Sequence, residues 1–163
     1  MLRIGALEAG TAGERLTRID LSAFLSGLVE AYRPVAEDAS HSLVSAIGTG
    51  LSVSADPEML AQAVINLIEN AILHTPAGCA VSIGLERRAG SCIIIVADNG
   101  PGIPEDEREH VLKRFYRLDG SGKPGAGLGL ALAAAVAAVH GARLELADNH
   151  PGLRVELRFD QAQ

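Results

Sequence analysis

The 163-residue sequence has few cysteines, no excess of basic residues and no long hydrophobic run. Its two cysteines, Cys79 and Cys92, show neither a CxxC pair nor a zinc-like spacing with histidine, so we expect reduced thiols rather than a disulfide framework. The net charge of -6 argues against nucleic-acid binding, because phosphate neutralisation needs a basic surface. The apolar runs at 93–97 and 128–139 are too short to span a bilayer, and no signal-peptide pattern begins the sequence. A soluble cytoplasmic domain is the expectation.

Hydrophobic residues make up 48% of the sequence, which is enough for the packed core of a single domain. Apolar spacing predicts an amphipathic helix after Asp20, with Pro34 perturbing its pattern. A second helix is expected from Asp56, which would cap it, with Pro57 at the first helical position. A third, apolar almost all round and therefore buried, is expected over residues 127–140.

Strand patterns lie between and after these helices. Strands are expected at 43–47 and 51–54, joined by a hairpin turn at residues 48–50. Residues 81–85 alternate as a one-sided strand, whereas the continuously apolar residues 93–96 predict a central strand covered on both faces. Two further strands, at 144–146 and 155–159, would be joined by a turn at residues 149–152. Residues 101–125, with a possible helical turn at 105–112, are expected to form a mobile cover segment.

Asp98 ends the most apolar strand, where an unpartnered carboxylate would be costly to bury. The exocyclic amine of a purine is one donor that would satisfy it. Gly100 and Gly102 would then let a flat base lie close to the backbone. The alternative is that Asp98-Asn99-Gly100 is only a turn, since such residues are common turn formers. These residues alone leave both interpretations open.

Asn66 and Asn70 lie one turn apart at the edge of the apolar stripe of the second helix, while Glu69 faces away. Their amide oxygens could approach a hard cation such as Mg²⁺. The alternative is a pair of ordinary amides at an amphipathic boundary. His74, one turn further on, is typical of a helix end rather than of a ligand.

Gly125, Gly127 and Gly129 precede the third helix and would expose backbone N–H groups at its positive end, where phosphates bind. The pattern is not the dinucleotide fingerprint, because Leu130 occupies the third glycine position. Residues 120–124 are not a P-loop, because position 117 is Arg and Pro124 replaces the hydroxyl residue that would hold magnesium. Tight helix packing is the alternative explanation of these glycines.

Aromatic and basic residues adjoin in the cover segment, at Phe115-Tyr116-Arg117. Arg114, Arg117 and Lys123 could reach phosphate oxygens, although solvated surface charge is the ordinary role of each. The aromatic pair could equally be a small cluster that pins the loop.

Four segments together resemble the motifs of one family. Residues 66–75 (Asn-Leu-Ile-Glu-Asn-Ala-Ile-Leu-His-Thr) resemble the N box of sensor histidine kinases, and residues 98–103 resemble the G1 box. Residues 114–117 resemble the F box and residues 125–130 the G2 box, and all four occur in family order. The sequence thus resembles the catalytic ATP-binding domain of these kinases, in the GHKL superfamily shared with gyrase, the Hsp90 chaperones and the MutL proteins.

The resemblance implies the Bergerat ATP-binding fold, an α/β (α+β) two-layer sandwich in which a mixed sheet of about five strands is backed by three helices, with a mobile lid. Residues 1–18 would be the end of a dimerisation helix and a linker, and residues 19–160 the catalytic domain. The implied ligands are ATP and Mg²⁺. The implied partners are the dimerisation and histidine-phosphotransfer domain of the parent kinase and a response regulator receiver domain. The parent could be anchored in a membrane.

The resemblance also implies roles for individual residues. Asp98 would accept from the adenine N6 amine, Asn70 would ligate Mg²⁺, Asn66 would help to place the phosphates, and Arg117 would be a catalytic lid cation. The full nucleotide-binding set comprises Asn66, Asn70, Ala71, His74, Asp98, Gly100, Gly102, Ile103, Phe115, Lys123, Gly125, Gly127, Leu128, Gly129 and Leu130. Related ATPases carry a glutamate at the position of Asn66 that activates water, so the asparagine favours phosphoryl transfer over hydrolysis.

Three features depart from the family pattern. None of the five histidines lies in the phosphoacceptor motif, so the acceptor histidine is expected on a domain absent from this chain. Leu73 replaces a common Lys or Arg, and Ala142 breaks the usual paired glycines. The alternatives are therefore a degenerate, non-catalytic nucleotide-binding or docking module, and a related ATPase or serine kinase of anti-sigma type.

Overall fold

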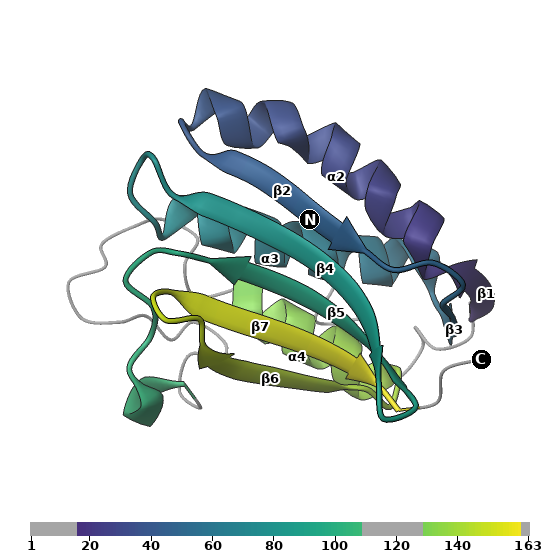
Figure 1. Cartoon of the computed structure of the whole chain (residues 1–163). Coiled ribbons are helices and arrows are strands. Elements are labelled where there is room, and N and C mark those ends of the chain that lie inside the picture. The colour runs from purple at the N-terminus through teal and green to yellow at the C-terminus, as the bar shows by residue number, and fades with distance from the viewer. Residues whose placement is uncertain (1–15, 109–128, 161–163) are drawn as a thin grey trace.

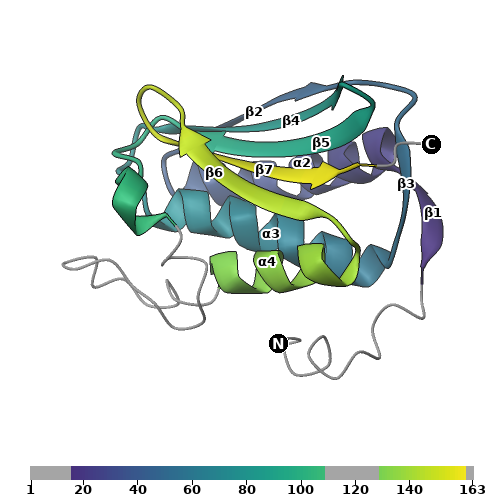
Figure 2. The same cartoon turned by 90° about the horizontal axis from the view of Figure 1, so that it is seen from below.

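A computed structural model describes residues 16–108 and 129–160. Five strands form one mixed sheet, and three helices lie on one of its faces (Figures 1 and 2). The sheet order is β2-β4-β5-β7-β6, in which only the β2–β4 pair is parallel. This architecture confirms the expected two-layer sandwich. The elements are α2 (Leu21–Asp38), β2 (Ser42–Ile47), α3 (Pro57–Leu73), β4 (Ala80–Arg88), β5 (Ser91–Asp98), α4 (Gly129–Val139), β6 (Arg143–Asp148) and β7 (Leu153–Phe159).

Two of the helices, α2 and α3, begin where the sequence predicts. Asp20 caps α2, and Asp56 caps α3 by accepting hydrogen bonds from the N–H groups of Glu58 and Met59. These bonds satisfy backbone donors that a helix start otherwise leaves unpaired. Pro34 lies inside α2 without ending it, since the helix continues to Asp38.

The hairpin expected over residues 43–54 is wrong. β2 continues beside β4 as far as Gly48, whose N–H donates to Leu85 O at 2.9 Å. The chain then turns into β3 (Ser52–Ala55), which pairs with β1 (Thr17–Asp20) in a separate two-stranded sheet. The local turn pattern was correct, but the partners of both strands are set by distant residues. β1 was not expected, and it begins two residues before the predicted domain start at residue 19.

The remaining expected elements are present with shifted ends. The apolar helix predicted over 127–140 is α4, and the possible turn at 105–112 is a short 3-10 helix, η2 (Glu105–Glu107). β6 and β7 pair with each other as predicted. Within the described ranges, no helix has both the length and the apolar character needed to cross a bilayer.

β5 is buried along its whole length, as predicted for a central strand. On one side, Ile94 and Val96 join the core beneath the helices. On the other side, Ile93, Ile95 and Ala97 form a second buried cluster, and no helix of residues 16–108 or 129–160 covers that face. Side chains of the flanking strands contribute to shielding it.

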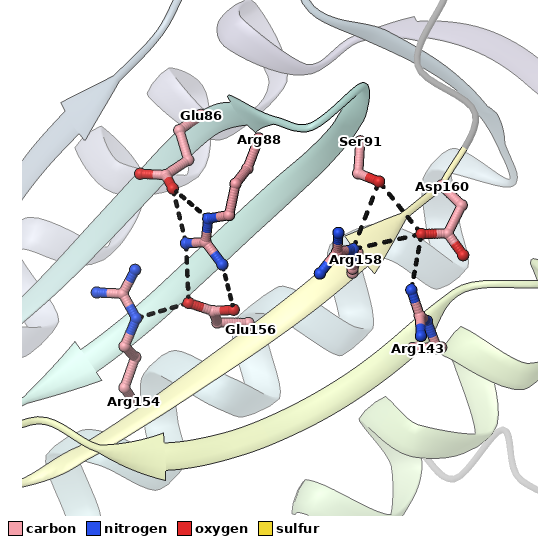
Figure 3. Close-up of polar contacts among 8 residues, drawn as sticks. All are labelled: Glu86, Arg88, Ser91, Arg143, Arg154, Glu156, Arg158 and Asp160. Carbon is pink, nitrogen blue, oxygen red and sulfur yellow. Dashed lines mark hydrogen bonds and ion pairs between the residues drawn. The ribbon is translucent and has the colours of Figure 1, made fainter.

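Charged side chains of the flanking strands provide this cover (Figure 3). Glu156 lies opposite Ile95 in the sheet register and accepts hydrogen bonds from Arg88 at 3.0 Å and from Arg154 at 2.7 Å. Glu86 binds the same Arg88 guanidinium at 2.7 Å. Arginine stems can shield apolar surface while their guanidinium groups stay paired. The hydrogen bond from Arg88, and then that from Arg154, holds the pKa of Glu156 below its ordinary value.

Replacing Glu156 by glutamine is expected to lower the free energy of unfolding at neutral pH by about 1 kcal/mol. Because the folded-state pKa is lowered, this stabilisation is fully present above the ordinary glutamate pKa of about 4.3. It is lost as the pH falls through the lowered value. Urea unfolding of both proteins from neutral to acid pH measures the difference, which should shrink in acid. Glu30→Gln is the control, because Glu30 pairs with Arg33 at an exposed site.

Candidate functional site

The Asp98 carboxylate lies at the end of β5 and is only 6% exposed. Its Oδ1 accepts hydrogen bonds from Gly100 N at 2.9 Å and from Leu153 N at 3.2 Å. Among the described residues, none donates to Oδ2. Asp98 therefore forms the local turn that the sequence suggested and is also a buried carboxylate with one oxygen left to accept from a further donor.

The turn between β6 and β7 holds the backbone of Asp98. Asn149 Nδ2 donates to Asp98 O at 2.8 Å. Gly152, at φ +114°, lies so close to that same carbonyl oxygen that a Cβ would overlap it. The sequence identified residues 149–152 as a turn, but nothing local in them indicated that the turn supports Asp98.

Gly100 and Gly102 are required by contacts within the protein. A Cβ on Gly100 would overlap the Thr75 methyl group and lie 3.0 Å from Thr75 Cβ. Gly102 has φ +78°, and a Cβ there would lie 2.9 Å from Gly152 O. The contact at Gly100 joins the residue that follows α3 to the turn that follows β5. The segments resembling the N and G1 boxes thus meet.

The α3 side of this junction carries the two expected amides. Asn66 and Asn70 are half-buried while Glu69 is exposed, as the helical pattern predicted. Gln62 Nε2 donates to Asn66 Oδ1 at 3.1 Å, which orients that amide. His74 is the C-cap residue of α3, and its N–H donates to Asn70 O at 3.0 Å.

Four other predicted binding residues are described. Ala71 in α3 and Leu130 in α4 are buried, and these two helices pack against each other. Ile103 packs against the main core. Gly129 is the first described residue of α4.

The other predicted site residues lie outside the described ranges. Their roles stay predictions from the sequence. They are Arg114, Phe115, Tyr116, Arg117, Lys123, Gly125, Gly127 and Leu128.

Sequence reasoning missed several residues that hold the site. Thr75 is 5% exposed and His41 is 6% exposed, and His41 Nε2 lies 2.7 Å from Thr75 Oγ1. Thr75 was recognised only as the end of a motif, and His41 lies 34 residues away in the sequence. No periodic or motif signal connects positions so far apart.

Comparison with known proteins agrees with this geometry. The family described as histidine kinase-, DNA gyrase B- and HSP90-like ATPase matches residues 55–163, which include α3, β5 and α4. The chain belongs to this family. The predicted resemblance to the catalytic ATP-binding domain of sensor histidine kinases is thereby confirmed.

Individual relatives give the same result. The sensor-like histidine kinase SenX3 of Mycolicibacterium smegmatis is 33% identical over 149 residues, covering 90% of this chain and 39% of the relative. The solved structure of the mycobacterial sensor histidine kinase MprB has a TM-score of 0.75 at 29% identity, covering 88% of this chain and 96% of that one. The ATP-binding domain of PrrB from Mycobacterium tuberculosis has a TM-score of 0.70 at 30% identity, with coverages of 90% and 97%. The chain spans about two fifths of the length of the curated relatives it matches.

Asp98→Asn should weaken the binding of an ATP analogue about tenfold, because an amide N–H₂ would replace the oxygen that is expected to accept from the adenine amine. The variant keeps one oxygen for the N–H groups of Gly100 and Leu153, whereas Asp98→Ala would leave both unpaired. Calorimetric titration measures the affinity, and thermal unfolding checks the fold. Asp38→Asn is the matched control, since Asp38 is exposed at the end of α2. Unchanged affinity in a folded Asp98→Asn protein would remove the adenine role.

Proposed function

We propose that this domain transfers the γ-phosphoryl group of Mg·ATP to a histidine on the dimerisation domain of a two-component sensor kinase, for relay to a response regulator receiver domain. The observation that carries the proposal is the junction of α3 with the Asp98 turn, where Thr75 packs against Gly100. It places a helix bearing two half-buried amides beside a buried, acceptor-only carboxylate. That combination suits an adenine at one end and metal-bound phosphates at the other.

The oxygens of the Asp98 carboxylate fit the adenine base of the nucleotide. Asp98 has an oxygen to accept from the adenine N6 amine, while its other oxygen is already held by two backbone N–H groups. The oxygen that is left to accept makes the site selective for a base with an N–H donor at that position. We assign adenine recognition to Asp98.

The amide oxygens of Asn66 and Asn70 also fit Mg²⁺, which prefers oxygen ligands and keeps phosphate oxygens in its coordination shell. Asn70 would hold the ion through its amide oxygen, and Asn66, oriented by Gln62, would help to place the phosphates. When bound, the ion would neutralise charge on the phosphate oxygens. Among the described residues, no group of three His, Cys, Asp or Glu side chains forms an alternative metal site.

The chemistry of Asn66 favours transfer rather than hydrolysis. An amide has no basic site at neutral pH and therefore cannot activate water as a carboxylate would. Phosphoryl transfer needs mainly positioning and charge neutralisation, which the surrounding residues can supply. We propose that Arg117 and Lys123 contribute cations, and that the backbone of Gly125, Gly127, Leu128 and Gly129 meets the phosphate tail before α4.

The phosphate acceptor is proposed to lie on another domain, because none of the five histidines stands in the family's acceptor motif. Two of them are engaged in structural contacts: His41 lies beside Thr75, and His140 Nε2 accepts from Asp56 N. We propose that the domain works in the cytoplasm, where ATP is available.

Titration with a nonhydrolysable ATP analogue should show binding that Mg²⁺ strengthens. Asn70→Ala should remove most of this Mg²⁺-dependent gain, about tenfold, while leaving the metal-free affinity nearly unchanged, because only a metal ligand is lost. Glu69→Gln, on the exposed face of the same helix, is the control. Absence of binding at millimolar analogue would overturn the proposal and favour the docking module.

Mixing the domain with ATP and a separately produced dimerisation domain should yield acid-labile phosphohistidine on the latter. If the domain instead hydrolyses ATP rapidly without an acceptor, and the Asn66→Ala variant still does so, the result would favour the alternative of a related ATPase. Acid-stable phosphate on a serine would favour a serine kinase of anti-sigma type.

A further inference from the structure

His41 is a buried histidine that lies at the carboxyl ends of two helices. Its Nδ1 lies 2.9 Å from Ala39 O, the C-cap carbonyl of α2. Its Nε2 lies 2.7 Å from Thr75 Oγ1, just beyond the end of α3. Thr75 Oγ1 in turn donates to Ala71 O at 2.7 Å, in the last turn of α3. No motif in the sequence includes His41.

These three contacts require three hydrogens when all are hydrogen bonds. A carbonyl oxygen only accepts, so the contact with Ala39 needs a hydrogen on His41 Nδ1, and the contact with Ala71 needs the Thr75 hydroxyl hydrogen. The remaining contact then needs a hydrogen on Nε2. A neutral imidazole and one hydroxyl supply only two, so the network is complete only when His41 carries both ring hydrogens.

The carboxyl end of each helix carries a partial negative charge, which favours hydrogen-bond donors such as the ring N–H groups of histidine. The ring is also well fixed, because His41 N donates to Ala36 O at 2.8 Å and closes the end of α2. His41 thus ties α2 to α3 through a side chain of defined orientation.

This link continues into the nucleotide pocket. Thr75, held by His41, contacts Gly100 so closely that no Cβ fits between them. Gly100 N donates to Asp98 Oδ1 at 2.9 Å. A shift of Thr75 would therefore shift the turn whose N–H group orients the Asp98 carboxylate.

We propose that His41 is a positioning residue for base recognition. Through Thr75 and Gly100 it fixes the Asp98 carboxylate in the orientation that selects a purine with an exocyclic amine over one without it. The proposal rests on the proposed nucleotide-binding function and adds to it a determinant of specificity outside all four motifs.

The test compares ATP and inosine triphosphate, which lacks the 6-amino group, as ligands of the wild-type protein, His41→Gln, Thr75→Val and the double variant. His41→Gln should weaken ATP binding about threefold to tenfold, the equivalent of one hydrogen bond, and should change inosine triphosphate binding much less. Thr75→Val, which keeps the volume but removes the hydroxyl, should have the same effect. The double variant should be no worse than either single variant, because both break the same link. Thr75→Ser, which keeps the hydroxyl, should retain more of the preference than Thr75→Val.

Glu30→Gln is the control, because Glu30 is exposed on α2 and pairs only with Arg33 among the contacts of the described residues.

Two failures can be told apart. If the wild-type protein binds neither nucleotide, the proposed function fails. If the wild-type protein prefers ATP and folded His41→Gln and Thr75→Val keep the same preference, the role of His41 is overturned. Should His41→Gln not fold, Thr75→Val decides the question by the same comparison.

Discussion

The burial of one carboxylate, that of Asp98, constrains the architecture around the site. Leaving this charge in the interior without donors would cost several kcal/mol. Two backbone N–H groups, from Gly100 and Leu153, supply donors to one of its oxygens. Those donors come from the turn after β5 and from the start of β7, so both segments must stay in register with the central strand. The packing of α3 on the same turn follows from the glycine at position 100, which leaves room for Thr75.

β5 is buried by different groups on the two faces of the sheet. Three helices cover one face, whereas paired arginine and glutamate side chains cover the other (Figures 2 and 3). The charged cover comes from the strands that flank β5: Arg88 of β4 reaches Glu156 of β7 across β5, and Arg154 contacts Glu156 from two residues away on β7 itself. The helical cover does more than exclude water. α3 contributes buried residues to the core through one side and presents Asn66 and Asn70 along its margin. Stability and ligand chemistry therefore depend on the same helix.

Two histidines form hydrogen bonds at helix ends, and these bonds need different numbers of ring N–H hydrogens. His140 Nε2 accepts from Asp56 N at 3.0 Å, and its Nδ1 lies 2.8 Å from Val136 O. One ring hydrogen satisfies both contacts, so the neutral form of His140 is complete. His41 faces one carbonyl and one hydroxyl that itself donates elsewhere, and its network needs two ring hydrogens. The same residue type thus links each pair of segments through a different arrangement of hydrogen bonds.

Local signals in the sequence determined the helix starts, the buried central strand and the four ordered motifs. Asp56-Pro57 caps α3 because an N-cap acts within its own turn, and residues 93–96 read as buried because continuous apolarity leaves no polar face. Only the tertiary structure decided that β2 joins β4, that β3 pairs with β1, and that Asn149, Leu153, Thr75 and His41 support Asp98. Strand partners and hydrogen-bond donors are chosen between residues far apart in the chain. Their pairing depends on how the layers pack, which no short stretch of sequence encodes.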